Sequence, residues 1–216
     1  MKLDGKVSLI TGGGKGIGKA IAERFAEEGS VVMICGTDEQ ALSQTIAEIT
    51  GKGSRAKAVA ADISSETSVE RLISAAIREF GRIDILVNNS GISGPTAPLV
   101  KLTTEDWEHT LAVNLTGTFL CSRYALPGMI ERKSGRIINI TSVAGLRGYA
   151  LRSPYCASKW AMIGLTKSLA LEVGRYDITV NAIAPGAVRG PRIDRVIRSR
   201  AAEMGRTVEE MEREYT

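Results

Sequence analysis

The sequence has few of the residues that metal centres, disulfides and stacking on nucleic acid require. It contains one histidine, His109, and three cysteines, and none of them has metal-ligand spacing, so we expect no metal site. An odd number of thiols favours a reducing compartment, and we expect a cytoplasmic protein. Aromatic residues make up 5% of the chain, which leaves few surfaces on which unpaired bases could stack.

Long apolar runs and a strong excess of one charge are also missing. No apolar stretch approaches the ~20 residues of a membrane span, and the first apolar run begins so close to Met1 that we expect no signal peptide. The net charge of +4 is dispersed along the chain and forms no basic helix. We therefore expect neither a membrane nor a nucleic acid as a partner.

Short runs rich in valine and isoleucine alternate with longer segments of helical periodicity. The runs predict strands at 6–11, 30–35, 56–62, 83–89, 136–141 and 177–183. Apolar residues at helical spacing predict helices within 18–29, 38–53, 68–81, 104–133 and 154–176. This alternation indicates an α/β fold, in which a parallel sheet is covered by helices on both faces. We see no linker or repeat, and we expect residues 1–216 to form a single domain.

A glycine-rich loop, "TGGGKGIG", joins the first predicted strand to the first predicted helix at residues 11–18. Glycines allow a tight turn and a close approach of the backbone to a pyrophosphate. The free N–H groups at the start of the following helix then bind that pyrophosphate. In this strand–turn–helix context, the loop predicts a dinucleotide-binding site.

Tyr155 and Lys159 lie one helical turn apart in "SPYCASKW", so their side chains share a helix face. An ammonium held near a phenol favours the phenolate, and such a pair could exchange protons with a substrate near neutral pH. The same spacing also occurs in ordinary surface pairs, so the motif needs support from the rest of the chain.

The glycine loop, "NNSG" at 88–91 and "YCASK" together resemble the short-chain dehydrogenase/reductase family, and most nearly its 3-oxoacyl-carrier-protein reductases. The resemblance implies a doubly wound Rossmann fold with strand order 3-2-1-4-5-6. It implies catalytic roles for four residues, namely Asn114, Ser142, Tyr155 and Lys159. The tyrosine would exchange a proton with the substrate oxygen, and the serine would orient that oxygen. The asparagine would kink its helix and hold a water that relays protons to the lysine. Taken alone, Ser142 could equally cap the next turn, and Asn114 could be a buried, hydrogen-bonded amide.

The resemblance also assigns a set of cofactor-binding positions. Besides Tyr155 and Lys159, they are Gly12, Lys15, Gly16, Ile17, Gly18, Thr37, Asp62, Ile63, Asn89, Gly91, Pro185, Gly186 and Val188.

The end of the second predicted strand bears on which nicotinamide cofactor binds. An acid there would bind both ribose hydroxyls and repel a 2′-phosphate, but this chain has Gly36 and Thr37. Asp38 follows, and we expect it to cap the next helix. Lys15 matches the basic residue that NADP-preferring members place beside the phosphate. We therefore predict NADP, with NAD as the alternative, because NAD-using relatives can carry a basic residue there too.

After Pro185, the family places a mobile lid over the substrate, which corresponds to residues 187–216. The lid carries several arginines and a single acid up to residue 200: Arg189, Arg192, Arg195, Arg198 and Arg200 against Asp194. We favour a solvated amphipathic helix; the alternative is that some arginines bind an anionic substrate such as an acyl thioester. Members continue into a further helix and a seventh strand that this sequence lacks, so we expect the strand at 177–183 to form an exposed sheet edge.

These patterns together predict an oxidoreductase that transfers hydride between NADP(H) and a carbonyl or secondary alcohol. A 3-oxoacyl thioester is one candidate substrate. The alternatives are an NAD-dependent secondary-alcohol dehydrogenase and a truncated, non-catalytic dinucleotide-binding protein. The resemblance also implies a homo-oligomer, a dimer or a tetramer, formed through the helices within 104–132 and 153–175.

Overall fold

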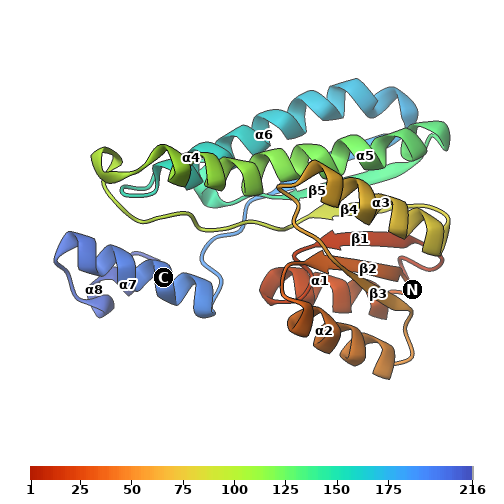
Figure 1. The fold of residues 1–216 in the computed structure, drawn as a ribbon, viewed down its shortest axis with the longest axis horizontal. Helices are drawn as coiled ribbons and strands as arrows, with labels where there is room; N and C mark the ends of the chain where they lie inside the picture. Colours follow the sequence, from red (N-terminus) through yellow and green to blue (C-terminus); the bar gives the residue numbers. More distant parts are fainter. Residues whose placement is uncertain (216) are drawn as a thin grey trace.

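The computed structural model describes residues 1–215, which contain one parallel sheet of six strands in the order β3-β2-β1-β4-β5-β6 (Figure 1). This order and the parallel pairing confirm the predicted doubly wound Rossmann fold. Each strand lies within about two residues of its predicted bounds. The strands are β1 (Val7–Thr11), β2 (Val31–Gly36), β3 (Ala56–Ala60), β4 (Ile85–Asn88), β5 (Gly135–Ile140) and β6 (Ile178–Ile183).

Helices cover both faces of the sheet, as the apolar strands predict. On one face, α1 (Gly16–Glu27) and α2 (Glu39–Gly51) pack against side chains such as Ile10. On the other face, α3 (Glu66–Phe80), α5 (Gly117–Glu131) and α6 (Ser153–Val173) pack against side chains such as Leu9. Adjacent residues of a strand point to opposite faces, so Leu9 and Ile10 enter two separate cores. Figure 1 shows the two helix layers on either side of the strands.

The long helix predicted over 104–133 is interrupted in the structure. It consists of α4 (Thr104–Leu111), one π-helical turn (Ala112–Thr116) and α5. The π turn contains the buried Asn114, whose side chain bonds outside its own helix. Such single-turn π segments occur most often at functional sites, and apolar periodicity does not reveal them.

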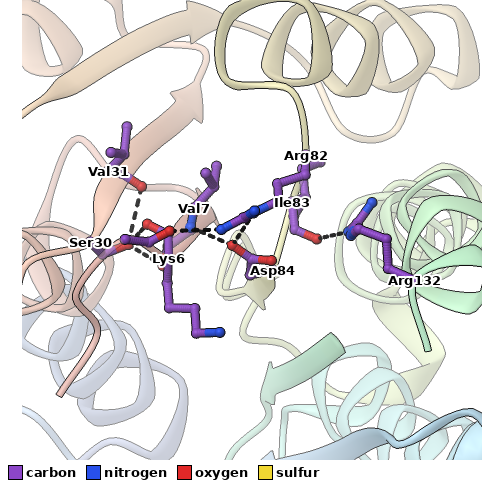
Figure 2. Close-up of polar contacts among 10 residues, drawn as sticks. Lys6, Val7, Ser30, Val31, Arg82, Ile83, Asp84 and Arg132 are labelled. Carbon is purple, nitrogen blue, oxygen red and sulfur yellow. Dashed lines mark hydrogen bonds and ion pairs between the residues drawn. The ribbon is translucent and has the colours of Figure 1, made fainter. Parts of the chain in front are cut away.

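Polar side chains tie together the amino ends of the central strands, at the opposite edge from the glycine loop. The Asp84 carboxylate accepts from the backbone N–H of Val7 at 2.8 Å and from Nε of Arg82 at 2.9 Å (Figure 2). Ser30 Oγ lies 3.0 Å from the carbonyl oxygen of Lys6. The polar groups at the amino ends of the strands are thus hydrogen-bonded within the protein. Ligands of α/β sheets bind at the opposite edge, at the carboxyl ends of the strands.

Within the described chain, β6 pairs only with β5, which is the expected edge position. Its last residue, Ile183, is 51% exposed. After β6, the chain forms α7 (Pro191–Met204) and α8 (Val208–Glu212), two amphipathic helices that bury Ile197 and Met211 between them. Figure 1 shows this pair set apart from the sheet. No helix in residues 1–215 is long and apolar enough to cross a membrane.

Gly18 makes the first helix fit against the glycine loop. A Cβ there would lie 2.2 Å from the carbonyl oxygen of Gly12 and 2.4 Å from Nδ2 of Asn89, so Gly18→Ala should destabilise the fold by about 1–3 kcal/mol. The matched control is Gly51→Ala at the end of α2, where nothing lies within 4 Å of the added Cβ. That change should stabilise the protein by up to about 1 kcal/mol. Urea unfolding measures both, and a Gly18→Ala midpoint equal to wild type would contradict the packing argument.

Candidate active site

The carboxyl ends of the strands open into one cavity of about 750 Å³. Most of the predicted site residues line it: Gly12, Lys15, Gly16, Ile17, Thr37, Asp62, Ile63, Asn89, Gly91, Ser142, Tyr155, Lys159, Pro185, Gly186 and Val188. Two predicted residues lie outside the lining. Gly18 packs behind the glycine loop, and Asn114 is fully buried behind the cavity wall.

The glycine loop has the shape that a pyrophosphate requires. Gly12 and Gly16 have φ values of 66° and 53°, a conformation that side chains with a Cβ rarely adopt. Helix α1 begins at Gly16 without a side-chain cap and without an acid in its first turn. Its first N–H groups therefore remain available to an anion, and the loop fits the phosphates of a dinucleotide.

Asn89 holds this loop in place. Its Nδ2 donates to the carbonyl oxygens of Thr11 at 2.9 Å and Gly12 at 3.2 Å. The family resemblance implies that Asn89 supports the cofactor at the end of the fourth strand. Its hydrogen bonds hold the backbone of the glycine loop in position.

Lys15 and Asp38 form an ion pair at the end of β2, with 2.5 Å between Nζ and Oδ2. Asp38 also caps α2, as predicted, by accepting from the backbone N–H of Ala41 at 2.9 Å. The Lys15 ammonium holds the pKa of the Asp38 carboxyl below its usual range. A 2′-phosphate bound here would therefore share Lys15 with a carboxylate, an arrangement that the separate interpretations of the two residues did not predict.

Tyr155 and Lys159 lie together in α6, with Nζ of Lys159 5.8 Å from the centre of the tyrosine ring. Lys159 is only 4% exposed, and its Nζ donates to the carbonyl oxygen of Ile140 at 3.0 Å. Burial, and to a smaller extent the charge of Arg192, lowers the pKa of Lys159 to about 7. In the free protein Lys159 therefore holds its proton much less tightly than an ordinary, solvated lysine does.

Ser142 and Asn114 are positioned by backbone contacts. Ser142 follows β5 and lines the cavity, while its Oγ accepts from the N–H of Ala144 at 3.1 Å. Asn114 accepts from the N–H of Ile92 at 2.8 Å and donates to Ser158 Oγ at 3.0 Å. Asn114 therefore joins the segment after β4 to α6 at Ser158, which directly precedes Lys159 and lies three residues after Tyr155.

Arg152, which lies directly before α6, is a further residue of this site that the sequence motifs did not indicate. Its side chain is 5% exposed, its Cζ lies 4.8 Å from the ring centre of Tyr155, and its Nη1 donates to Thr96 Oγ1 at 3.1 Å. Arg152 also lines the cavity. Its spacing of three residues before Tyr155, at the start of the same helix, was the available signal.

Comparison with known proteins agrees with this site. The family model of short chain dehydrogenases matches residues 6–201. A 3-oxoacyl-[acyl-carrier-protein] reductase of a Synechocystis species is 43% identical over 187 residues, which span 86% of this chain and 75% of the relative. The predicted family resemblance is confirmed, and the chain belongs to the short-chain dehydrogenases.

Two solved structures share the fold closely. The NAD⁺-bound xylitol dehydrogenase has a TM-score of 0.90 at 37% identity, and the match covers 93% of this chain and 78% of that one. A single-site variant of an actinorhodin polyketide ketoreductase with NADPH has a TM-score of 0.91 at 38% identity, and the match covers 95% of this chain and 79% of that one.

The protein is therefore a nicotinamide-dependent oxidoreductase that acts on alcohols or ketones. The two relatives hold different cofactors, so the choice between NAD and NADP depends on this chain's own residues.

Burial of Lys159 should cost stability in a pH-dependent way. The pKa of Lys159 in the folded protein, about 7, lies below its ordinary value of 10.5. Below pH 7 the amine is protonated in both the folded and the unfolded chain, so the full free-energy penalty of burying the charged amine is present there. The penalty disappears as the pH rises towards 10.5, where the unfolded chain also loses the proton. Lys159→Met should therefore raise the melting temperature more at pH 6 than at pH 10. Calorimetry at both pH values measures this, and a change that is equal at both would contradict the burial argument.

Proposed function

We propose that the protein is an NADP(H)-dependent carbonyl reductase and secondary-alcohol dehydrogenase, in which Ser142, Tyr155 and Lys159 are the catalytic residues and Asn114 is a positioning residue. The observation that carries this proposal is that the glycine loop, Ser142 and the Tyr155–Lys159 pair line one cavity. We propose further that residues 1–216 form one dehydrogenase domain and that 187–216 act as its lid.

A nicotinamide held by the glycine loop would supply the hydride-transfer chemistry when bound. In reduction, the Tyr155 hydroxyl gives its proton to the substrate oxygen, and in oxidation the phenolate takes that proton back. The Ser142 hydroxyl donates a hydrogen bond to the same oxygen and fixes the carbonyl for reaction. Lys159, when protonated, would stabilise the phenolate, and the family resemblance implies that its ammonium also holds the nicotinamide ribose. Asn114 acts through position, because its hydrogen bonds fix α6 against the segment after β4.

Tyr155→Phe tests the proton transfer. It should lower kcat by about 100- to 10,000-fold, because the carbonyl oxygen loses its acid while the ring stays in place. The assay follows absorbance at 340 nm with ketones and 3-oxoacyl thioesters and with both cofactors. Calorimetric titration of cofactor is the control, and its affinity should change little. Turnover by the phenylalanine variant at the wild-type rate would contradict the assignment.

The same panel separates the two alternatives. Turnover with NADH but not with NADPH would favour the NAD-dependent dehydrogenase. Cofactor binding without turnover over the whole panel would favour the non-catalytic binding protein. A 3-oxoacyl thioester is our candidate substrate because the Synechocystis relative at 43% identity carries that activity in its name.

NADP is proposed because Lys15 and Thr37 line the cavity at the end of β2, where they offer a cation and a hydroxyl that suit a 2′-phosphate. Lys15→Ala should raise the KM for NADPH about 10-fold and leave the KM for NADH nearly unchanged. The matched variant is Asp38→Asn, which keeps a capping side chain and releases Lys15 from its ion pair. It should shift the preference further towards NADPH. If Lys15→Ala changed the KM values for NADPH and NADH equally, Lys15 would not recognise the 2′-phosphate and the assignment would be wrong.

The proposal includes location and assembly. Three unpaired, buried cysteines suit a reducing compartment, and we place the enzyme in the cytoplasm. Large apolar side chains are exposed on the outer helices, namely Phe119 on α5 and Trp160 and Leu171 on α6. Trp160 and Leu171 are three helical turns apart and share one stripe. We propose that this surface joins two copies of the chain in a homodimer.

A further inference from the structure

Charge is divided sharply between the two ends of the cavity. Of the described residues that line it, two are acidic, Asp38 and Asp62, and both follow β2 or β3 at the adenosine end. The end around Tyr155 has no acid in its lining. It is lined by the cationic side chains Arg152, Lys159, Arg189, Arg192 and Arg195. A neutral ketone needs none of these charges, whereas an anionic substrate would be attracted to them.

Arg152 is the member of this group that the fold buries. Its side chain is 5% exposed, and within residues 1–215 it takes part in no ion pair. Its polar contact is the hydroxyl of Thr96, and its guanidinium lies over the ring of Tyr155. Burial lowers the pKa of the Arg152 guanidinium, although an arginine keeps its charge at neutral pH.

A second arginine of similar burial shows the usual arrangement in this protein. Arg200 is also 5% exposed, but its Nη2 lies 3.4 Å from a carboxylate oxygen of Glu214 and its Nη1 donates to the Tyr215 hydroxyl at 2.8 Å. Buried charges are normally paired in this way. Arg152 therefore lacks the carboxylate that Arg200 has, and it faces the cavity in which a ligand could supply one.

The cofactor does not account for this charge. The phosphates of a dinucleotide are matched by the glycine loop and the uncapped start of α1. Arg152 instead precedes α6 and contacts Thr96 in the segment after β4, beside the proposed proton donor. The tyrosine ring stabilises the buried guanidinium less than a carboxylate would, because the ring carries no net charge.

We propose that Arg152 binds a carboxylate of the substrate, so that the enzyme prefers an oxo acid and the corresponding hydroxy acid to the uncharged 3-oxoacyl thioester considered above. This inference rests on the proposed function, because it places the carboxylate relative to the carbonyl that Tyr155 protonates. Arg152 and Tyr155 are in contact, so the carboxylate and the reacting carbonyl lie only a few bonds apart. Arg192 and Arg195 of α7 line the same end and would close over the bound acid.

Matched pairs of acids and methyl esters test this inference. Acetoacetate, 4-oxopentanoate and 5-oxohexanoate place one, two and three methylene groups between the carbonyl and the carboxylate, and each methyl ester removes the charge. The wild type should prefer the acid by about 10- to 100-fold in kcat/KM for at least one spacing. Arg152→Met, which keeps an unbranched side chain, should reduce that preference to near one. Arg198→Met is the control, because Arg198 is exposed on α7 and outside the cavity lining, and it should keep the wild-type preference.

The outcomes separate this inference from the proposed function. Turnover of the esters with no preference for the acid at any spacing would leave the reductase assignment standing and overturn the role of Arg152. A preference that survives in Arg152→Met would overturn it as well. If neither form is reduced, the carboxylate site is tested by thermal stabilisation with 4-oxopentanoate. The proposed function itself fails only if the wider panel of ketones and thioesters is not turned over either. A melting temperature raised in wild type and not in folded Arg152→Met supports the carboxylate site, and equal shifts overturn it.

Discussion

Lys159 is an amine buried in the cavity wall, and the rest of the site is arranged around its burial. Its Nζ donates to the last carbonyl of β5, and its own carbonyl oxygen accepts from Thr141 Oγ1 at 2.9 Å. Gly145 approaches so closely that a Cβ there would lie 2.7 Å from the same carbonyl oxygen. On the other side, a Cβ at Gly91 would lie 3.6 Å from Nζ. The end of β5 and the segments after β4 and β5 thus meet at one side chain.

This arrangement links stability to function through the protonation of one amine. Burial favours the neutral amine, whereas the proposed chemistry needs the cation beside the phenol. An anionic ligand, whether cofactor or substrate, would raise the pKa of Lys159 again by adding negative charge nearby. In the free protein the pKa of Lys159 is close to neutral pH, so a charge bound nearby can change its protonation state. Arg192 opposes that change, because its positive charge also lowers the pKa of Lys159.

The sequence carried enough information to predict the strands, their order through the family resemblance, and the gathering of most site residues. Parallel strands end at one edge, so motifs that follow β1, β4 and β5 had to meet there. The resemblance implied a kink at Asn114, and the helix is interrupted there. The π-helical form of the interruption was not predicted, because the partners of Asn114, Ile92 and Ser158, are distant in sequence. The Lys15–Asp38 ion pair was missed for the same reason, since it joins two loops 23 residues apart.

Arg152 shows a different limit of prediction from sequence. An arginine before a helix is normally exposed, and its burial depends on Thr96, on the Tyr155 ring and on the helices after β6 that enclose the cavity. Only the assembled fold shows that its charge has no carboxylate partner in the described residues.

The most direct test of this account is an NMR titration of the lysine side chains in the free protein, with ¹³C at Cε. The account predicts one signal with a midpoint near pH 7 that is absent from the Lys159→Met spectrum. Titration of every lysine near pH 10.5 would show that Lys159 is an ordinary surface cation, and the central claim would be wrong.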